Sequence, residues 1–214
     1  PLGLMYCVEI GFFLAVSLMM GKISADTLGG NQITLQFLWL FSMTTFCMAQ
    51  AITIRMGHTL GAGDIKSAER AGYIGMYCGV MFMVFIALIY WFAPNLLISM
   101  DFDIHNPNNQ AIVNLAKQFF VFAAIFQIIE AIRFGAFGAL RALKDTRFTM
   151  YVSILVFWII ALPVGYILAF HFHLQGNGIW WGMIFSQIIG SIIMVWRYRV
   201  KIREYSRHAL QPLN

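Results

Sequence analysis

Charged side chains are scarce in this sequence. They make up 11% of its 214 residues, against about 25% in a typical soluble domain, while hydrophobic residues make up 60%. The mean hydropathy is +0.75. This composition argues against a soluble enzyme and a disordered tail, and the 14 lysines and arginines are too scattered to form a nucleic-acid-binding face. The composition is that of an integral membrane protein.

Cysteines are few and catalytic motifs are missing. Cys7, Cys47 and Cys78 lie inside apolar runs, which predicts buried small hydrophobic residues and no disulfide framework or CxxC metal site. No HExxH, GxSxG or P-loop pattern occurs, so nothing supports hydrolysis or ATP use. His171 and His173 form an HxH pair without a supporting carboxylate or cysteine, which makes a poor metal site. We therefore expect a non-enzymatic protein without a metal or organic cofactor.

Six apolar runs are long enough to cross a bilayer, which takes about 20 helical residues. The turns between them are short and contain Gly, Asn and Asp, so no linker separates two domains. The sequence predicts an all-α membrane fold with a six-helix lobe over residues 1–197 and a basic cytoplasmic tail over residues 198–214. Pro163 interrupts the fifth run and should kink it. The predicted spans are Leu2–Gly21, Ile33–Met56, Ala68–Ala93, Ile112–Leu140, Thr149–Phe170 and Gly178–Trp196.

Lysine and arginine are unevenly distributed between the two ends of these spans. Basic loops stay in the cytoplasm, so both termini are predicted to be cytoplasmic in the cell inner (plasma) membrane. Trp180 and Trp181 then open the sixth span at the outer interface, as in a membrane aromatic belt. The basic residues assigned to the cytoplasmic side are Arg55, Lys66, Arg70, Arg141, Lys144, Arg147, Arg197, Arg199, Lys201, Arg203 and Arg207.

A weak internal repeat links the second and fourth spans. Gly57 and Asp64 in GHTLGAGD match Gly138 and Asp145 in GALRALKD, and the members of each pair lie seven positions apart. Repeated helix pairs are typical of transporters. A Gly and an Asp at a helix exit can also simply terminate the helix.

Two acidic residues, Glu9 and Glu130, lie inside predicted spans. A carboxylate at that depth is costly unless it is paired, hydrated or protonated, so it usually marks a functional site. Glu9 is predicted to hold a proton or a monovalent cation, and the alternative is a structural carboxylate bound to a neighbouring helix. Glu130 shares a helical face with Gln127 and Arg133. A buried Arg133–Glu130 ion pair that only fixes packing is the alternative there.

Several stretches together resemble the multidrug and toxic compound extrusion (MATE) family, NorM type. They are AITIRMGHTLGAGDIKSAERAG, FGALRALKDTRFTMY, VFWIIALPVGYILA and GNGIWWG. The resemblance covers nearly the whole chain and implies the C-terminal six-helix half of a twelve-helix antiporter, which exports organic cations in exchange for sodium ions or protons. The family's membrane acids fall on Glu9 and Glu130, and Gln32 matches a glutamine implicated in substrate contact.

Two positions depart from the family pattern. NorM-type members typically have Asp at the position of Glu130 and often Tyr at that of Phe126, and these changes suggest the hypothesis that protons are favoured over sodium. Phenylalanines in a cavity suit aromatic cations. The substrate-binding candidates are Phe13, Gln32, Phe126 and Gln127.

The implied partners are an organic cation, membrane lipid and a second six-helix lobe, which comes from the same gene or from a homodimer. The chain begins inside its first span, as expected of a fragment. One alternative is a lipid-linked oligosaccharide flippase of the same superfamily, which predicts several basic residues in its cavity, where this sequence offers Arg133. The other is a non-transporting membrane assembly subunit, in which Glu9 and Glu130 face helix contacts.

Overall fold

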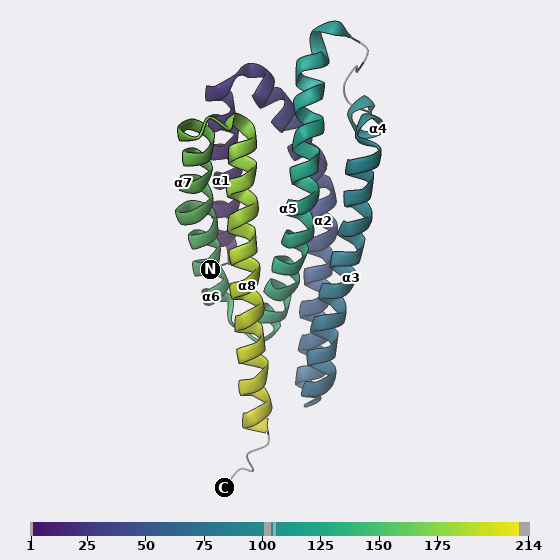
Figure 1. Cartoon of the computed structure of the whole chain (residues 1–214). Coiled ribbons are helices and arrows are strands. Elements are labelled where there is room, and N and C mark those ends of the chain that lie inside the picture. Colours follow the sequence, from purple (N-terminus) through teal and green to yellow (C-terminus); the bar gives the residue numbers. More distant parts are fainter. Residues whose placement is uncertain (1, 101–103, 105, 210–214) are drawn as a thin grey trace.

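The computed structural model describes residues 2–100, 104 and 106–209 and shows a bundle of long helices (Figure 1). Six helical segments are long and apolar enough to cross a membrane, which confirms the six predicted spans. The elements in chain order are α1 (Leu2–Ile23), α2 (Ala25–Gly61), α3 (Ile65–Phe92), α4 (Pro94–Ser99), η1 (Pro107–Asn109), α5 (Gln110–Ala142), α6 (Thr146–Ile154), η2 (Leu155–Ala161), α7 (Leu162–Tyr166), η3 (Ile167–His171) and α8 (Gln175–Ala209).

Helix α5 forms the centre of the bundle, where it packs against α2, α3 and α8. Its last two turns are the most enclosed part, because residues 133–140 are all buried. Gly138 lets α2 approach closely, since a Cβ at this position would lie 2.3 Å from the carbonyl oxygen of Ala49. The Thr53 hydroxyl donates to the Gly138 carbonyl at 2.8 Å and joins the two helices there. The α2–α5 contact is therefore tight at the end of the bundle where both helices terminate.

The fifth span is irregular around Pro163. The predicted interruption takes the form of two π-helical segments, η2 and η3, on either side of the short α-helix α7 that contains the proline. Such wide turns accommodate the missing N–H of a proline without breaking the span. Helix α8 packs directly against this segment, because a Cβ on Gly182 would lie 2.5 Å from the backbone nitrogen of Gly165.

The turn after α2 and the turn after α5 have the same backbone conformation. Gly63 (φ 78°) and Lys144 (φ 60°) are both left-handed, and each precedes an aspartate. The N–H groups of the two aspartates, Asp64 and Asp145, each donate to the carbonyl five residues earlier, and the two residues before each aspartate donate to matching carbonyls as well. The weak sequence repeat therefore corresponds to a structural repeat of the same turn.

The two aspartates of these turns have different side-chain partners. Asp64 caps α3 by accepting a hydrogen bond from the Ser67 backbone N–H at 3.0 Å. Hydrogen bonds from Ser67 hold the pKa of Asp64 below its usual value. Asp145 instead accepts from Arg197 Nε of α8 at 2.7 Å and ties the turn to the last helix.

Helix α8 continues beyond the predicted boundary at residue 197. Tyr198 and Ile202 are buried in the core of the bundle, so the first part of the predicted tail is a packed helix. Residues 210–214 of that tail lie outside the described residues.

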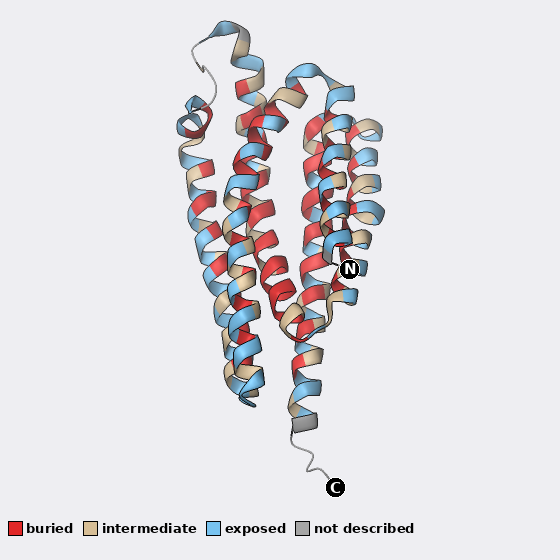
Figure 2. Cartoon of the chain, turned by 180° about the vertical axis from the view of Figure 1, so that it is seen from behind, coloured by how far each residue is buried: buried red, intermediate tan, exposed pale blue. Residues whose placement is uncertain are grey.

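Exposed residues lie on the outward-facing sides of the helices (Figure 2), and many of them are large and apolar, as a lipid-facing surface requires. Two sequence expectations are corrected here. Cys7, Cys47 and Cys78 are exposed on this surface and are not buried. Trp180 is fully buried and stacks on Phe119, so only its neighbour Trp181 remains available for an interfacial belt.

Candidate functional site

The carboxylate of Glu9 forms a buried ion pair that joins α1 to α5. Glu9 is 4% exposed, and its Oε1 accepts a hydrogen bond from Arg133 Nη2 at 2.6 Å. The guanidinium of Arg133 also lies over the rings of Phe134 and Phe157, at 4.7 and 5.0 Å from their centroids. The alternative of a buried Arg133–Glu130 ion pair is therefore wrong. Arg133 reaches across the helix interface to the acid on α1 and does not pair along its own helix.

Glu130 is buried nearby on α5 and is held by a hydroxyl group. It is 2% exposed, and its Oε2 accepts a hydrogen bond from Ser42 Oγ of α2 at 2.6 Å. Gln127 Nε2 donates to the carbonyl of Leu38 at 3.0 Å and lies 3.4 Å from the same Ser42 oxygen. The Oε1 atom of Gln127 is buried without a hydrogen-bond partner. The amide, the hydroxyl and the carboxylate thus form one polar cluster between α2 and α5.

A cavity of about 680 Å³ lies between α1 and α2 and reaches Glu9. Glu9 lies on its wall, and so does Ser42, the hydroxyl that binds Glu130. The remaining lining is mostly apolar and aromatic: Tyr6, Ile10, Gln36, Phe37, Trp39, Leu40, Met43 and Phe46. Glu9 is therefore directly accessible from the cavity, and Glu130 lies one hydrogen bond behind the wall.

A second hollow of about 460 Å³ continues along the same two helices. It shares Ile10, Gln36 and Trp39 with the first and contains Phe13 and Gln32, two of the substrate-binding candidates. Gln32 is exposed, and its Nε2 donates to Ser17 Oγ at 3.2 Å. The structure thus places Glu9, Phe13 and Gln32 along one groove.

The other two candidates, Phe126 and Gln127, lie behind this groove in the core. Phe126 is fully buried, with its ring edge-on to Phe13 and to Trp180 at centroid distances of 6.5 and 6.3 Å. Gln127 is fully buried beside Ser42. Phe126 can therefore influence the groove through the ring of Phe13, and Gln127 through Ser42.

Sequence reasoning missed Ser42 and Trp39. Ser42 connects the cavity to Glu130, and its signal is a hydroxyl inside the apolar run FLWLFSM. Trp39 lines both hollows and packs edge-on against Phe13 at 4.8 Å. Across residues 2–100, 104 and 106–209, no group of three His, Cys, Asp or Glu side chains is placed to hold a metal ion.

Comparisons with known proteins identify a family and relatives for this chain. The family model described as MatE matches residues 1–167. The chain is 35% identical over 201 residues to "Multidrug resistance protein NorM" of Burkholderia vietnamiensis. This alignment covers 94% of this chain and 44% of that protein. It is 36% identical over 198 residues to "Probable multidrug resistance protein NorM" of Mesorhizobium japonicum. This second alignment covers 92% of this chain and 42% of that protein.

Solved structures show the same fold. A structure described as MATE in the bent conformation superposes with a TM-score of 0.87 at 11% identity and covers 97% of this chain and 45% of that one. The eukaryotic MATE transporter AtDTX14 superposes with a TM-score of 0.78 at 20% identity, over 97% of this chain and 47% of the other. The chain thus spans a little under half the length of these proteins.

Proposed function

Because this chain belongs to the MatE family, we propose that it forms the C-terminal six-helix lobe of a multidrug efflux antiporter, which exports organic cations in exchange for sodium ions or protons. The NorM relatives are about twice its length, so a second lobe supplies the other half of the pathway. One observation carries the proposal. The α1–α2 cavity has a buried acid on its wall and, on the same wall, the serine that binds a second buried acid.

The coupling ion binds at Glu9 and Glu130 in this proposal. A buried carboxylate is costly in the membrane unless a positive charge or a proton neutralises it. Arg133 neutralises Glu9 in the present structure, so an arriving sodium ion or proton must compete with that guanidinium. Glu130 has a hydroxyl donor and no ion-pair partner in the part of the chain that the structure describes. Its charge therefore favours uptake of a proton or a cation.

The organic cation binds in the groove between α1 and α2. The rings of Phe13 and Trp39 offer cation–π contacts, and Glu9 offers the opposite charge. An ion that occupies the carboxylates weakens the attraction for the organic cation. Each ligand shifts the balance between outward-open and inward-open states by its differential affinity for them, so competition at shared carboxylates couples the two flows.

The flippase alternative needs several basic residues around the cavity. Within the described chain Arg133 is the one buried basic side chain, and it is engaged with Glu9. An anionic lipid-linked sugar would therefore meet a carboxylate and aromatic rings in the groove. This favours a cationic substrate.

The proposal is tested by drug efflux from proteoliposomes that contain the full-length transporter, with sodium and proton gradients imposed separately. We expect Glu9→Gln to lower gradient-driven efflux at least about ten-fold, the order of magnitude for one lost charge interaction of about 1.4 kcal/mol. Glu130→Asp should change the ratio of sodium-driven to proton-driven efflux, because the shorter acid lies farther from Ser42 Oγ.

The matched control is Glu69→Gln, which removes an exposed acid on α3 outside the α1–α2 groove. Efflux by this variant should equal that of the wild type under both gradients. Unchanged coupling in both Glu9→Gln and Glu130→Asp would remove these residues from the ion site.

A further inference from the structure

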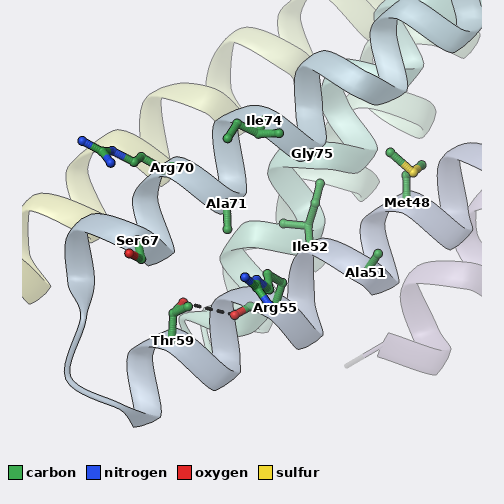
Figure 3. Close-up of a pocket in the computed structure, with 10 residues that line it drawn as sticks. All are labelled: Met48, Ala51, Ile52, Arg55, Thr59, Ser67, Arg70, Ala71, Ile74 and Gly75. Carbon is green, nitrogen blue, oxygen red and sulfur yellow. Dashed lines mark hydrogen bonds between the residues drawn. The ribbon is translucent and has the colours of Figure 1, made fainter.

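A separate pocket lies between α2 and α3, close to the turn that joins them (Figure 3). Its volume is about 400 Å³, and it shares no lining residue with the α1–α2 groove. Ile52 and Ala51 of α2 and Ala71 of α3 give it an apolar floor, while Arg55 of α2 and Arg70 of α3 supply its charge. The pocket is therefore amphiphilic, and the proposed antiport mechanism does not use it.

Neither arginine of this pocket forms an ion pair with another described residue. The ion pairs of the described chain join Arg133 to Glu9, Arg197 to Asp145 and Lys201 to Glu204, and none involves Arg55 or Arg70. Both side chains are exposed, and in Figure 3 Arg55 lies between the two helices while Arg70 extends from α3. Both arginines line the same pocket, and as exposed, flexible side chains they can turn toward an anion at its rim.

The nearby polar groups leave a net positive charge around the pocket. The Thr59 hydroxyl already donates to backbone carbonyls of its own helix, including that of Arg55 at 3.1 Å. Asp64 caps α3 through Ser67 and keeps its negative charge, and the positive charges of Arg70 and Lys66 help to hold its pKa below the usual value. Glu69 lines a neighbouring hollow together with Lys66 and Arg70, so three basic residues, Arg55, Lys66 and Arg70, stand against the two acids Asp64 and Glu69.

An apolar stripe leads from the pocket along α3 toward the middle of the membrane. Ile74, Tyr77, Met81 and Phe85 follow Arg70 at helical spacing, and each is at least half exposed. In a bilayer this stripe faces hydrocarbon, and its first member, Ile74, also lines the pocket. A ligand with an anionic head and long apolar chains would match both parts at once.

We propose that this pocket binds the headgroup of an anionic phospholipid. Arg55 and Arg70 contact the phosphate, for which the planar guanidinium offers paired N–H donors, and the acyl chains lie along Ile74, Tyr77 and Met81. Basic pockets between membrane helices are suited to such headgroups. An uncharged helix packed into the same place would bury both guanidinium groups without a partner, which is unfavourable.

Native mass spectrometry of the full-length protein, released from detergent with equal amounts of phosphatidylglycerol and phosphatidylcholine, tests this site. We expect the wild type to retain phosphatidylglycerol preferentially. Arg55→Gln and Arg70→Gln should each lower that retention roughly five-fold, and the double variant about thirty-fold. The matched control is Arg147→Gln, an exposed arginine at the same end of the bundle on α6, and it should retain the lipid like the wild type.

A second variant keeps both charges and removes the space. Ala51→Trp places a large side chain in the pocket from an exposed position on α2, so lipid retention should fall while the helical circular dichroism signal stays unchanged. Equal retention of the two lipids by the wild type would overturn the proposal. So would an equal loss in Arg147→Gln, normal retention in Ala51→Trp, or displacement of the lipid by inorganic phosphate alone, which would indicate a free-anion site.

Discussion

Glu9 and Glu130 are both buried, yet different groups hold them. Glu9 is paired with Arg133, which is itself 1% exposed and whose guanidinium packs on two rings. Glu130 is held by the Ser42 hydroxyl. Breaking one member of a buried ion pair leaves an uncompensated charge, whereas replacing both members is often nearly neutral. The two acids should therefore respond differently when their partners are changed.

At the scale of single residues, we predict strong coupling between Glu9 and Arg133. Arg133→Gln alone should lower the free energy of unfolding by about 3–5 kcal/mol, because it leaves Glu9 charged and unpaired. The double variant Glu9→Gln, Arg133→Gln should recover most of that loss. Denaturant unfolding in detergent measures the four members of the cycle, with Arg199→Gln as an exposed control. Additive effects of the two single changes would contradict a direct pair.

The sequence predicted which acids lie in the membrane but not which groups bind them. A glutamate inside an apolar run is visible without a structure, and so Glu9 and Glu130 were found. The partner of Arg133 depends on how α1 packs against α5, and spacing along α5 points to Glu130 instead of Glu9. Ser42 carries no charge and costs little in a membrane helix, so hydropathy gives it no weight. The family resemblance, by contrast, is confirmed by the matching family model.

At the scale of helices, hydropathy found every span but underestimated several lengths. Helix α2 begins at Ala25, eight positions before the predicted span, because Ser24 caps it by accepting from the Thr27 N–H at 3.0 Å. Its first turns include Asn31, which is fully buried against neighbouring helices although it is polar. Hydropathy measures preference for hydrocarbon, so it cannot detect helical turns that contain polar residues.

The repeated turn gives an element-scale prediction with an internal control. Gly57 and Gly138 occupy equivalent positions before the two turns, but a Cβ at Gly57 meets nothing within 4 Å, whereas at Gly138 it meets the Ala49 carbonyl. Gly138→Ala should therefore force α2 and α5 apart and cost about 1–3 kcal/mol of stability. Gly57→Ala should be neutral or stabilise the protein by up to about 1 kcal/mol, since alanine favours a helix.

Thermal unfolding of the two variants in the same detergent measures this difference. The equivalence of the turns makes the comparison sharp, because helix propensity alone predicts the same gain at both positions. Equal melting temperatures for the two variants would show that the α2–α5 contact is not tight at Gly138.

At the scale of the whole molecule, the bundle is apolar around its sides and basic at one end. Which side chains face lipid could not be predicted, because the spans are hydrophobic on all faces and show no clear periodicity. Cys7, Cys47 and Cys78 were expected in the core for that reason, and they lie on the surface instead. The basic end could be predicted without a structure. Every second turn lies on the same side of the membrane, and most of the lysines and arginines lie in or near those turns.

This charge asymmetry predicts the orientation, with both ends of the chain in the cytoplasm. Single cysteines at Ala62, in the basic turn after α2, and at Leu174, in the turn before α8, lie at opposite ends of the bundle and are exposed. The three native cysteines can be replaced by alanine, because their small side chains lie on the outer surface. A membrane-impermeant thiol reagent applied to intact cells that express the full-length protein should label Leu174→Cys, and should label Ala62→Cys only after permeabilisation. The reverse pattern would place the basic end outside, and the arginines of the α2–α3 pocket would then face the outer leaflet.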